Sequence, residues 1–270
     1  MLELKFLFAI SILITILCAG WLPFKRAKRL NETAHEHDFS IGETLATGVF
    51  LGAGLLHMLP DASHQFDQQG FHYPLAELIT GMIFLLFLWL EHLGSALYHQ
   101  GHTHHHEPEH ACEHPHRREP QPTQSAFAIL AWLMLSFHSF ILGTALGLND
   151  QSSMITMLFL AIITHKWAES FAIAMQLSKT SLARWLQGTM FLFFALMTPL
   201  GILLGWYFEH HHNTHLIDSV LMAASAGTFL YLGTLHGLER CVLVERCCNL
   251  RDFSFVIIGF ILMAAVAIYV

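Results

Sequence analysis

Apolar runs of about 20 residues recur along the whole chain, and each is long enough to cross about 30 Å of hydrocarbon as a helix. Of the 270 residues, 54% are hydrophobic and 12% are charged, about half of the roughly 25% charged residues of a soluble domain. The sequence therefore predicts an all-α, polytopic membrane protein with an eight-helix bundle, whose spans are Leu2–Pro23, Ile41–Pro60, Pro74–Tyr98, Ala126–Leu148, Met154–Leu177, Leu182–Phe208, Leu216–Leu238 and Phe253–Val270.

The basic residues orient this bundle. Of the 13 lysines and arginines, 11 fall in alternate loops: Lys25, Arg26, Lys28, Arg29, Arg117, Arg118, Lys179, Arg184, Arg240, Arg246 and Arg251. The remaining two, Lys5 and Lys166, lie within predicted spans. By the positive-inside rule the basic loops are cytoplasmic, so both termini lie outside. We therefore expect a multi-pass protein of the cell membrane, embedded in the lipid bilayer.

The chain has no segment that could form a separate soluble domain, so residues 1–270 are expected to form one transmembrane domain. The longest segment between spans, residues 99–124, holds eight histidines and four prolines and is too polar to build a core. We expect it to be a disordered cytoplasmic loop. It is either a weak metal-capturing segment or a tolerated linker, and its candidate metal-capturing residues are His102, His104, His105, His106 and His110.

Two spans carry ionisable residues near their midpoints, where such groups are costly and normally mark a substrate or ion path. His165 and Glu169 stand four residues apart, so they share one face of a helix. His138 lies at similar depth in the preceding span, which a short loop joins to the next. Imidazole and carboxylate are ligands of divalent first-row metals, and three protein ligands leave positions open for exchange. The alternative is that these groups only hold helices together by polar contacts.

Lys166 points about 100° away from His165 around the helix. We therefore expect it to neutralise a carboxylate or to snorkel into a cavity instead of sharing the site.

Further polar residues lie nearer the two ends of the spans. His57 and Asp61, again four residues apart, lie near the outer surface, and His236 and Glu239 lie near the inner end of the seventh span. With the central cluster they place polar groups at the outer mouth, the middle and the inner mouth of the bundle. A conduit across the membrane needs groups at these depths.

Several segments resemble the signature helices of the ZIP family of divalent metal transporters: GAGLLHMLPDA, HSFILGTALGL, HKWAESFAIA and GTFLYL. The resemblance implies a transporter that carries Zn²⁺ or a related ion toward the cytoplasm by alternating access of the elevator type, as a homodimer. It implies no enzymatic activity, no cofactor and no nucleic-acid partner. By the same resemblance His138, His165 and Glu169 fall on metal-ligand positions, and Ser139 falls beside the first of these ligands at a position that can also contribute.

This sequence departs from the family pattern at three positions. Leu142 stands where a carboxylate is often found, and Lys166 stands where some members have an acidic residue that bridges a second metal. Both departures favour a single metal ion. His236 stands where a glutamate is common, which would alter the exit site.

Two other functions fit parts of the sequence. A metal–proton antiporter of the cation-diffusion class binds zinc with an HxxxD pair, as in His57 and Asp61, but usually has six spans and a cytoplasmic carboxy-terminal domain. An intramembrane zinc hydrolase would use the same three ligands to activate water, but the chain has no HExxH motif. The ligand set suits Zn²⁺ and also Fe²⁺, Mn²⁺ or Co²⁺.

Overall fold

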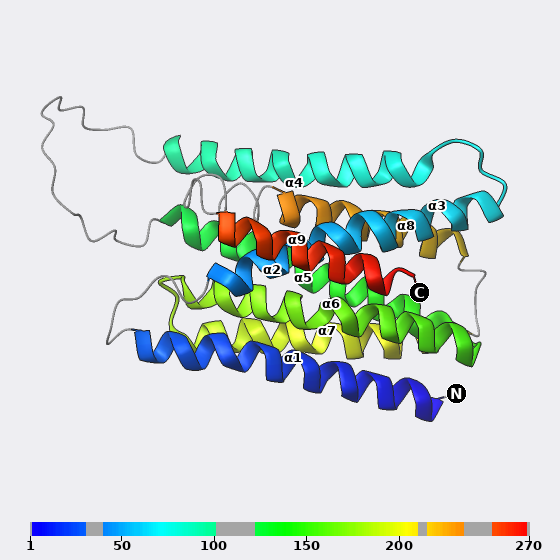
Figure 1. The fold of residues 1–270 in the computed structure, drawn as a ribbon, viewed down its shortest axis with the longest axis horizontal. Helices are drawn as coiled ribbons and strands as arrows, with labels where there is room; N and C mark the ends of the chain where they lie inside the picture. The colour runs from blue at the N-terminus through cyan, green and yellow to red at the C-terminus, as the bar shows by residue number, and fades with distance from the viewer. Residues whose placement is uncertain (1, 31–39, 101–121, 210–214, 235–249, 269–270) are drawn as a thin grey trace, which may run out of the picture.

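The computed structural model describes residues 2–30, 40–100, 122–209, 215–234 and 250–268. Within these ranges the chain folds into helices that lie roughly parallel to the long axis of the bundle. Both termini lie at the same end of the bundle (Figure 1). The helices are α1 (Leu2–Leu30), α2 (Ser40–Ala53), the π-helical segment η2 (Gly54–Met58), α3 (Leu59–Gln68), α4 (Leu75–Gln100), α5 (Pro122–Leu148), α6 (Ser152–Ser178), α7 (Arg184–Glu209), α8 (His215–Tyr231) and α9 (Leu250–Val266).

Because α2, η2 and α3 are continuous, the described helices form eight rods. Seven of these rods are long and apolar enough to cross a membrane. The eighth, α9, has 17 residues and lies among the others in Figure 1; at 1.5 Å per residue it is about 25 Å long. The prediction of an all-α polytopic membrane protein is confirmed.

The predicted end of the second span at Pro60 was wrong, because the rod continues to Gln68. Pro60 lies at the start of α3, directly after the π-helical segment. There the Leu59 N–H donates to the carbonyl of Gly54, five residues back. A proline lacks a backbone donor, and this change of hydrogen-bond register accommodates it without ending the helix.

Other boundaries also differ from those predicted. Pro23 lies inside α1, which continues to Leu30. Helices α4 and α5 take up both ends of the predicted 99–124 loop, since α4 reaches Gln100 and α5 begins at Pro122. The five candidate metal-capturing histidines of that loop lie outside the described residues, as do His236 and Glu239.

The helices pack as two groups. One contains α1, α5, α6 and α7, and the other contains α2 with η2 and α3, α4, α8 and α9; the most extensive helix contacts lie within each group. Hydrogen bonds within each group add to these contacts. Lys5 Nζ donates to the Gly147 carbonyl at 2.7 Å, joining α1 to α5, and Thr80 Oγ1 donates to the Ala223 carbonyl at 2.9 Å, joining α4 to α8.

Close backbone contact through glycine holds each group together. In the first group, a Cβ added at Gly201 of α7 would overlap the Phe140 carbonyl of α5. In the second group, a Cβ added at Gly48 of α2 would overlap the Val256 carbonyl of α9. Small residues at such contacts let membrane helices approach closely. The two groups are therefore each tightly packed units.

This packing predicts that Gly201→Ala lowers thermal stability. The added methyl group has no space against α5, and overpacking of this kind costs about 1–3 kcal/mol. Gly188→Ala is the matched control on the same helix, because a Cβ there meets nothing within 4 Å. Thermal unfolding in detergent, followed by size-exclusion chromatography, measures both variants. Equal melting temperatures for Gly201→Ala and the wild type would contradict the packing argument.

Candidate metal site

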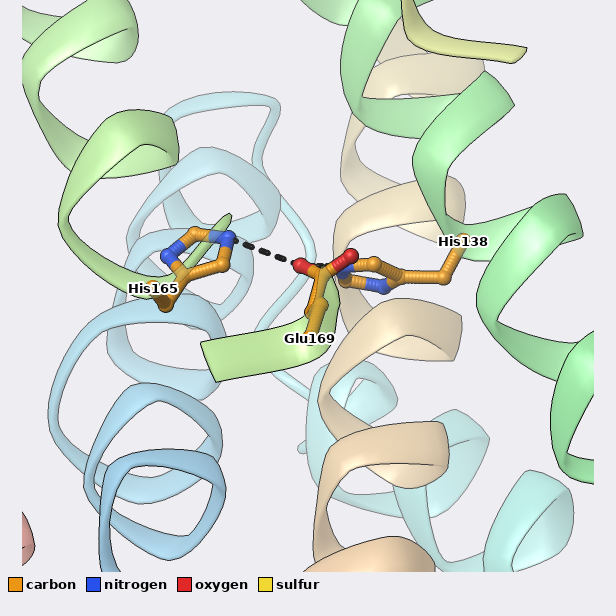
Figure 2. Close-up of side chains that lie close together, drawn as sticks. All are labelled: His138, His165 and Glu169. Carbon is orange, nitrogen blue, oxygen red and sulfur yellow. Dashed lines mark ion pairs between the residues drawn. The ribbon is translucent and has the colours of Figure 1, made fainter. Parts of the chain in front are cut away.

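Three buried side chains from the first helix group converge on one another (Figure 2). His138 comes from α5, while His165 and Glu169 come from α6. Glu169 Oε1 lies 3.5 Å from His138 Nε2 and 3.4 Å from His165 Nε2. One ligand atom from each residue lies within 4.8 Å of the other two. The three residues predicted from the sequence are thus brought together at one point.

Local sequence explains this convergence. His165 and Glu169 are one helical turn apart, so their side chains lie on the same face of α6. Helices α5 and α6 are joined by residues 149–151 alone, which makes them antiparallel neighbours. His138 and His165 both lie near the middle of their helices, so they meet at matched depth.

The geometry suits a metal ion. Ligand atoms about 2.0 Å from a tetrahedral zinc ion lie about 3.3 Å apart, close to both imidazole–carboxylate distances. Among the described residues, no hydrogen-bond partner meets either ring nitrogen of His138 and His165 or Glu169 Oε1. A buried polar atom without a partner costs about 1–3 kcal/mol. A cation between the three residues would satisfy Nε2 of both histidines and Oε1 of the glutamate.

The other oxygen of Glu169, Oε2, already accepts hydrogen bonds. Lys166 Nζ donates to Glu169 Oε2 at 2.8 Å and to Ser139 Oγ at 2.7 Å. Ser139 Oγ in turn donates to Glu169 Oε2 at 3.4 Å. All three residues are fully buried. Lys166 therefore neutralises a carboxylate, which is one of the two roles expected for it. Because this carboxylate is Glu169 of the three-residue cluster, the expectation that Lys166 lies apart from the cluster was wrong.

An aromatic residue that sequence reasoning did not assign to the site covers it. The centroid of the Phe229 ring in α8 lies 4.3 Å from the centroid of the His138 ring and 5.4 Å from that of the His165 ring. Phe229 is fully buried and belongs to the GTFLYL segment near the middle of the seventh span. It comes from the second helix group, so the site lies at the boundary between the two groups.

The other predicted positions have different outcomes. His57 is buried in the π-helical segment, and its Nδ1 lies 3.1 Å from Asp61 Oδ2. This pair is not part of the three-residue cluster, and π-helical segments are common at functional sites. Leu142 is buried and brings no ligand atom.

Comparison with known proteins identifies the family of this chain. The profile of the family described as ZIP zinc transporter matches residues 2–126 and 98–267. Human zinc transporter ZIP2 is 29% identical over 294 residues, covering 95% of this chain and 92% of that protein. Mouse zinc transporter ZIP2 is 31% identical and covers 88% of both chains. Probable zinc transporter 10 of Arabidopsis thaliana is 22% identical over 96% of this chain and 84% of its own length.

These matches span almost the whole chain, including both helices that carry the three converging residues. The cation-diffusion antiporter is set aside because the chain matches a different family of transporters. The intramembrane hydrolase is set aside because the matched family consists of transporters and not of enzymes. The chain therefore belongs to the ZIP family of metal transporters.

Proposed function

We propose that this protein carries divalent metal ions, Zn²⁺ foremost, through the His138, His165 and Glu169 site. The supporting observation is the set of buried ligand atoms that lack a hydrogen-bond partner among the described residues. Burying such atoms in a membrane is unfavourable, so a protein that retains them gains from a cation that passes between them. Three protein ligands leave coordination positions free, which allows an ion to exchange.

Zinc is the preferred ion on chemical grounds. Two imidazoles and one carboxylate form a ligand set known from zinc sites, and the related proteins named above are zinc transporters. Such a site binds Fe²⁺, Co²⁺ and Mn²⁺ as well, with Mn²⁺ the weakest by the usual order of affinities. These ions are substrates in this proposal, and no resident cofactor is required.

The two helix groups support an alternating-access mechanism of the elevator type. The three metal ligands belong to α5 and α6, whereas Phe229 and the His57–Asp61 pair belong to the other group. Sliding one tightly packed group along the other would expose the site to each side of the membrane in turn. We propose transport toward the cytoplasm by a homodimer in the cell membrane, with both termini outside.

His57 and Asp61 are proposed to lie on the outer part of the ion path. Asp61 is about two-fifths exposed, while His57 is nearly buried. The pair therefore joins an accessible carboxylate to a buried imidazole. A cation arriving from the outer side meets similar ligand chemistry before it reaches the central site.

Transport should depend on all three central residues. Replacing His138, His165 or Glu169 with alanine removes one of three ligands, and each substitution should lower Zn²⁺ uptake at least about tenfold. Uptake into proteoliposomes measures the effect, and the melting temperature of each variant shows that the fold persists. His64→Ala is the matched control, since His64 is exposed and lies next to Gln68 outside the site. Wild-type uptake by all three alanine variants would refute the proposed site.

The site should hold one ion, because Lys166 occupies Glu169 Oε2 and Leu142 offers no ligand. At 4 Å and an effective dielectric of about 20, the lysine charge would repel a second divalent cation by roughly 8 kcal/mol, twice the value for two unit charges.

The Zn²⁺ content of the wild type, measured by equilibrium dialysis, should therefore exceed that of the His165→Ala, Glu169→Gln double variant by one ion. Both proteins retain the His-rich segment, so its contribution cancels. A difference of two ions would show that the second site exists.

A further inference from the structure

A groove lies between α1 and α7 of the first helix group, and none of the three metal-site residues lines it. Its cavity volume is about 140 Å³. One wall is a stripe of α1 that runs from Leu2 to Leu13, and the other is a stripe of α7 from Pro199 to Trp206. The lining residues recur every three or four positions, so each stripe occupies one face of its helix.

The groove exists because α1 and α7 pack directly on each other near one end and leave space near the other. A Cβ added at Gly20 would overlap the ring of Phe191, and the centroids of the Phe24 and Phe191 rings lie 5.4 Å apart. Nearer the N-terminus, the small side chain of Ala9 lines the space between the helices. The groove therefore lies toward the end of the bundle that holds the N-terminus (Figure 1).

The length of the groove matches the depth of one lipid leaflet. Leu13 follows Leu2 by 11 positions, which is about 16 Å along a helix that rises 1.5 Å per residue. Half of a hydrocarbon core about 30 Å thick is about 15 Å. Both α1 and α7 are long and apolar enough to cross a membrane. The groove thus extends from one membrane surface to about the midplane.

The end of the groove near the N-terminus has features of a membrane surface. Trp206, which lines the groove, is 37% exposed, and tryptophan is enriched where hydrocarbon meets the headgroups. Lys5 also lines the groove, and its ammonium donates to the Gly147 carbonyl in the last turn of α5. The opposite end is formed by the apolar side chain of Leu13. The groove therefore suits a molecule with a polar end at the surface and an apolar chain below it.

The surroundings of the groove point to lipid instead of water. Its rims include Phe6, Ile10 and Leu203, which are 54%, 46% and 44% exposed. In a membrane span, exposed apolar side chains of this kind face hydrocarbon. An apolar cavity of about 150 Å³ stays dry and takes up small apolar molecules. An acyl chain is the apolar group that the bilayer supplies at this position.

We propose that the groove binds one acyl chain of a phospholipid from the leaflet at the end of the bundle where the termini lie. The chain lies between α1 and α7, and the phosphate group lies at the level of Lys5 and Trp206. It fills the space beside Ala9 and braces this half of α1 against α7. The lipid is thus a structural ligand of the first helix group, and its binding does not depend on which ion is transported.

Native mass spectrometry of the full-length protein, purified in mild detergent, counts the phospholipids that remain bound. Ala9→Phe places a ring in the space proposed for the acyl chain. Cys18→Phe is the matched control, because it adds the same ring at an exposed position of α1 that does not line the groove. The wild type and Cys18→Phe should each retain one more phospholipid per chain than Ala9→Phe. Equal lipid counts in the three proteins would overturn the assignment.

Thermal unfolding provides a second readout and tests whether the variant folds. Adding dioleoyl phosphatidylcholine to delipidated wild type, at about 100 times the dissociation constant, should raise the melting temperature by about 5–10 °C. The melting temperature of Ala9→Phe should not respond, because the ring already fills the groove. Should that variant not fold, Leu203→Trp narrows the groove from α7 and replaces it. The same response to lipid in the variant and the wild type would show that the groove does not hold the chain.

A second copy of this protein is the other molecule that could cover the groove. Size-exclusion chromatography with light scattering measures the oligomeric state of the wild type and of Ala9→Phe. The lipid assignment predicts the same state for both proteins. A changed oligomeric state in Ala9→Phe with an unchanged lipid count would identify the groove as a protein interface and refute the assignment.

Discussion

The structure depends on how one buried carboxylate is neutralised. Glu169 lies at the centre of a membrane bundle, where an isolated charge is costly. Lys166 satisfies one of its oxygens from the same helix, and Ser139 adds a second contact. The other oxygen faces two histidines without a hydrogen bond from the described residues. One oxygen of the carboxylate is thus held in place, and in the proposed function the other oxygen binds the cation.

Around this carboxylate, two tightly packed helix groups meet along a less tightly packed boundary. At glycine residues the backbones of α5 and α7, and those of α2 and α9, are in direct contact. Each group is therefore expected to move as a rigid body. Between the groups lie the aromatic cover of Phe229 and the Glu43–Lys179 pair. A protein that must move an ion without opening a continuous pore gains from this division, because motion is confined to one surface.

Most of the fold could be predicted from the sequence because hydrocarbon thickness fixes the length of an apolar helix. The predictions were wrong at Pro60, where a π-helical segment carries the rod onward, since a change in backbone hydrogen bonding leaves no signal in composition. The convergence of His138, His165 and Glu169 could be predicted from the spacing of His165 and Glu169 and from the short connection to α5. Phe229 could not be placed near these residues, because its contacts arise from packing between distant segments. Lys166 was misjudged because its long side chain reaches Glu169 three residues on, although its Cβ points away from His165.

The central claim is that a transported divalent cation binds between His138, His165 and Glu169, and anomalous diffraction from Zn²⁺-loaded crystals tests it most directly. Data collected above and below the zinc absorption edge locate the ion independently of any activity. The structure predicts a zinc peak within bonding distance of both Nε2 atoms and of Glu169 Oε1. Zinc peaks elsewhere in the protein, with none between these three residues, would contradict the account.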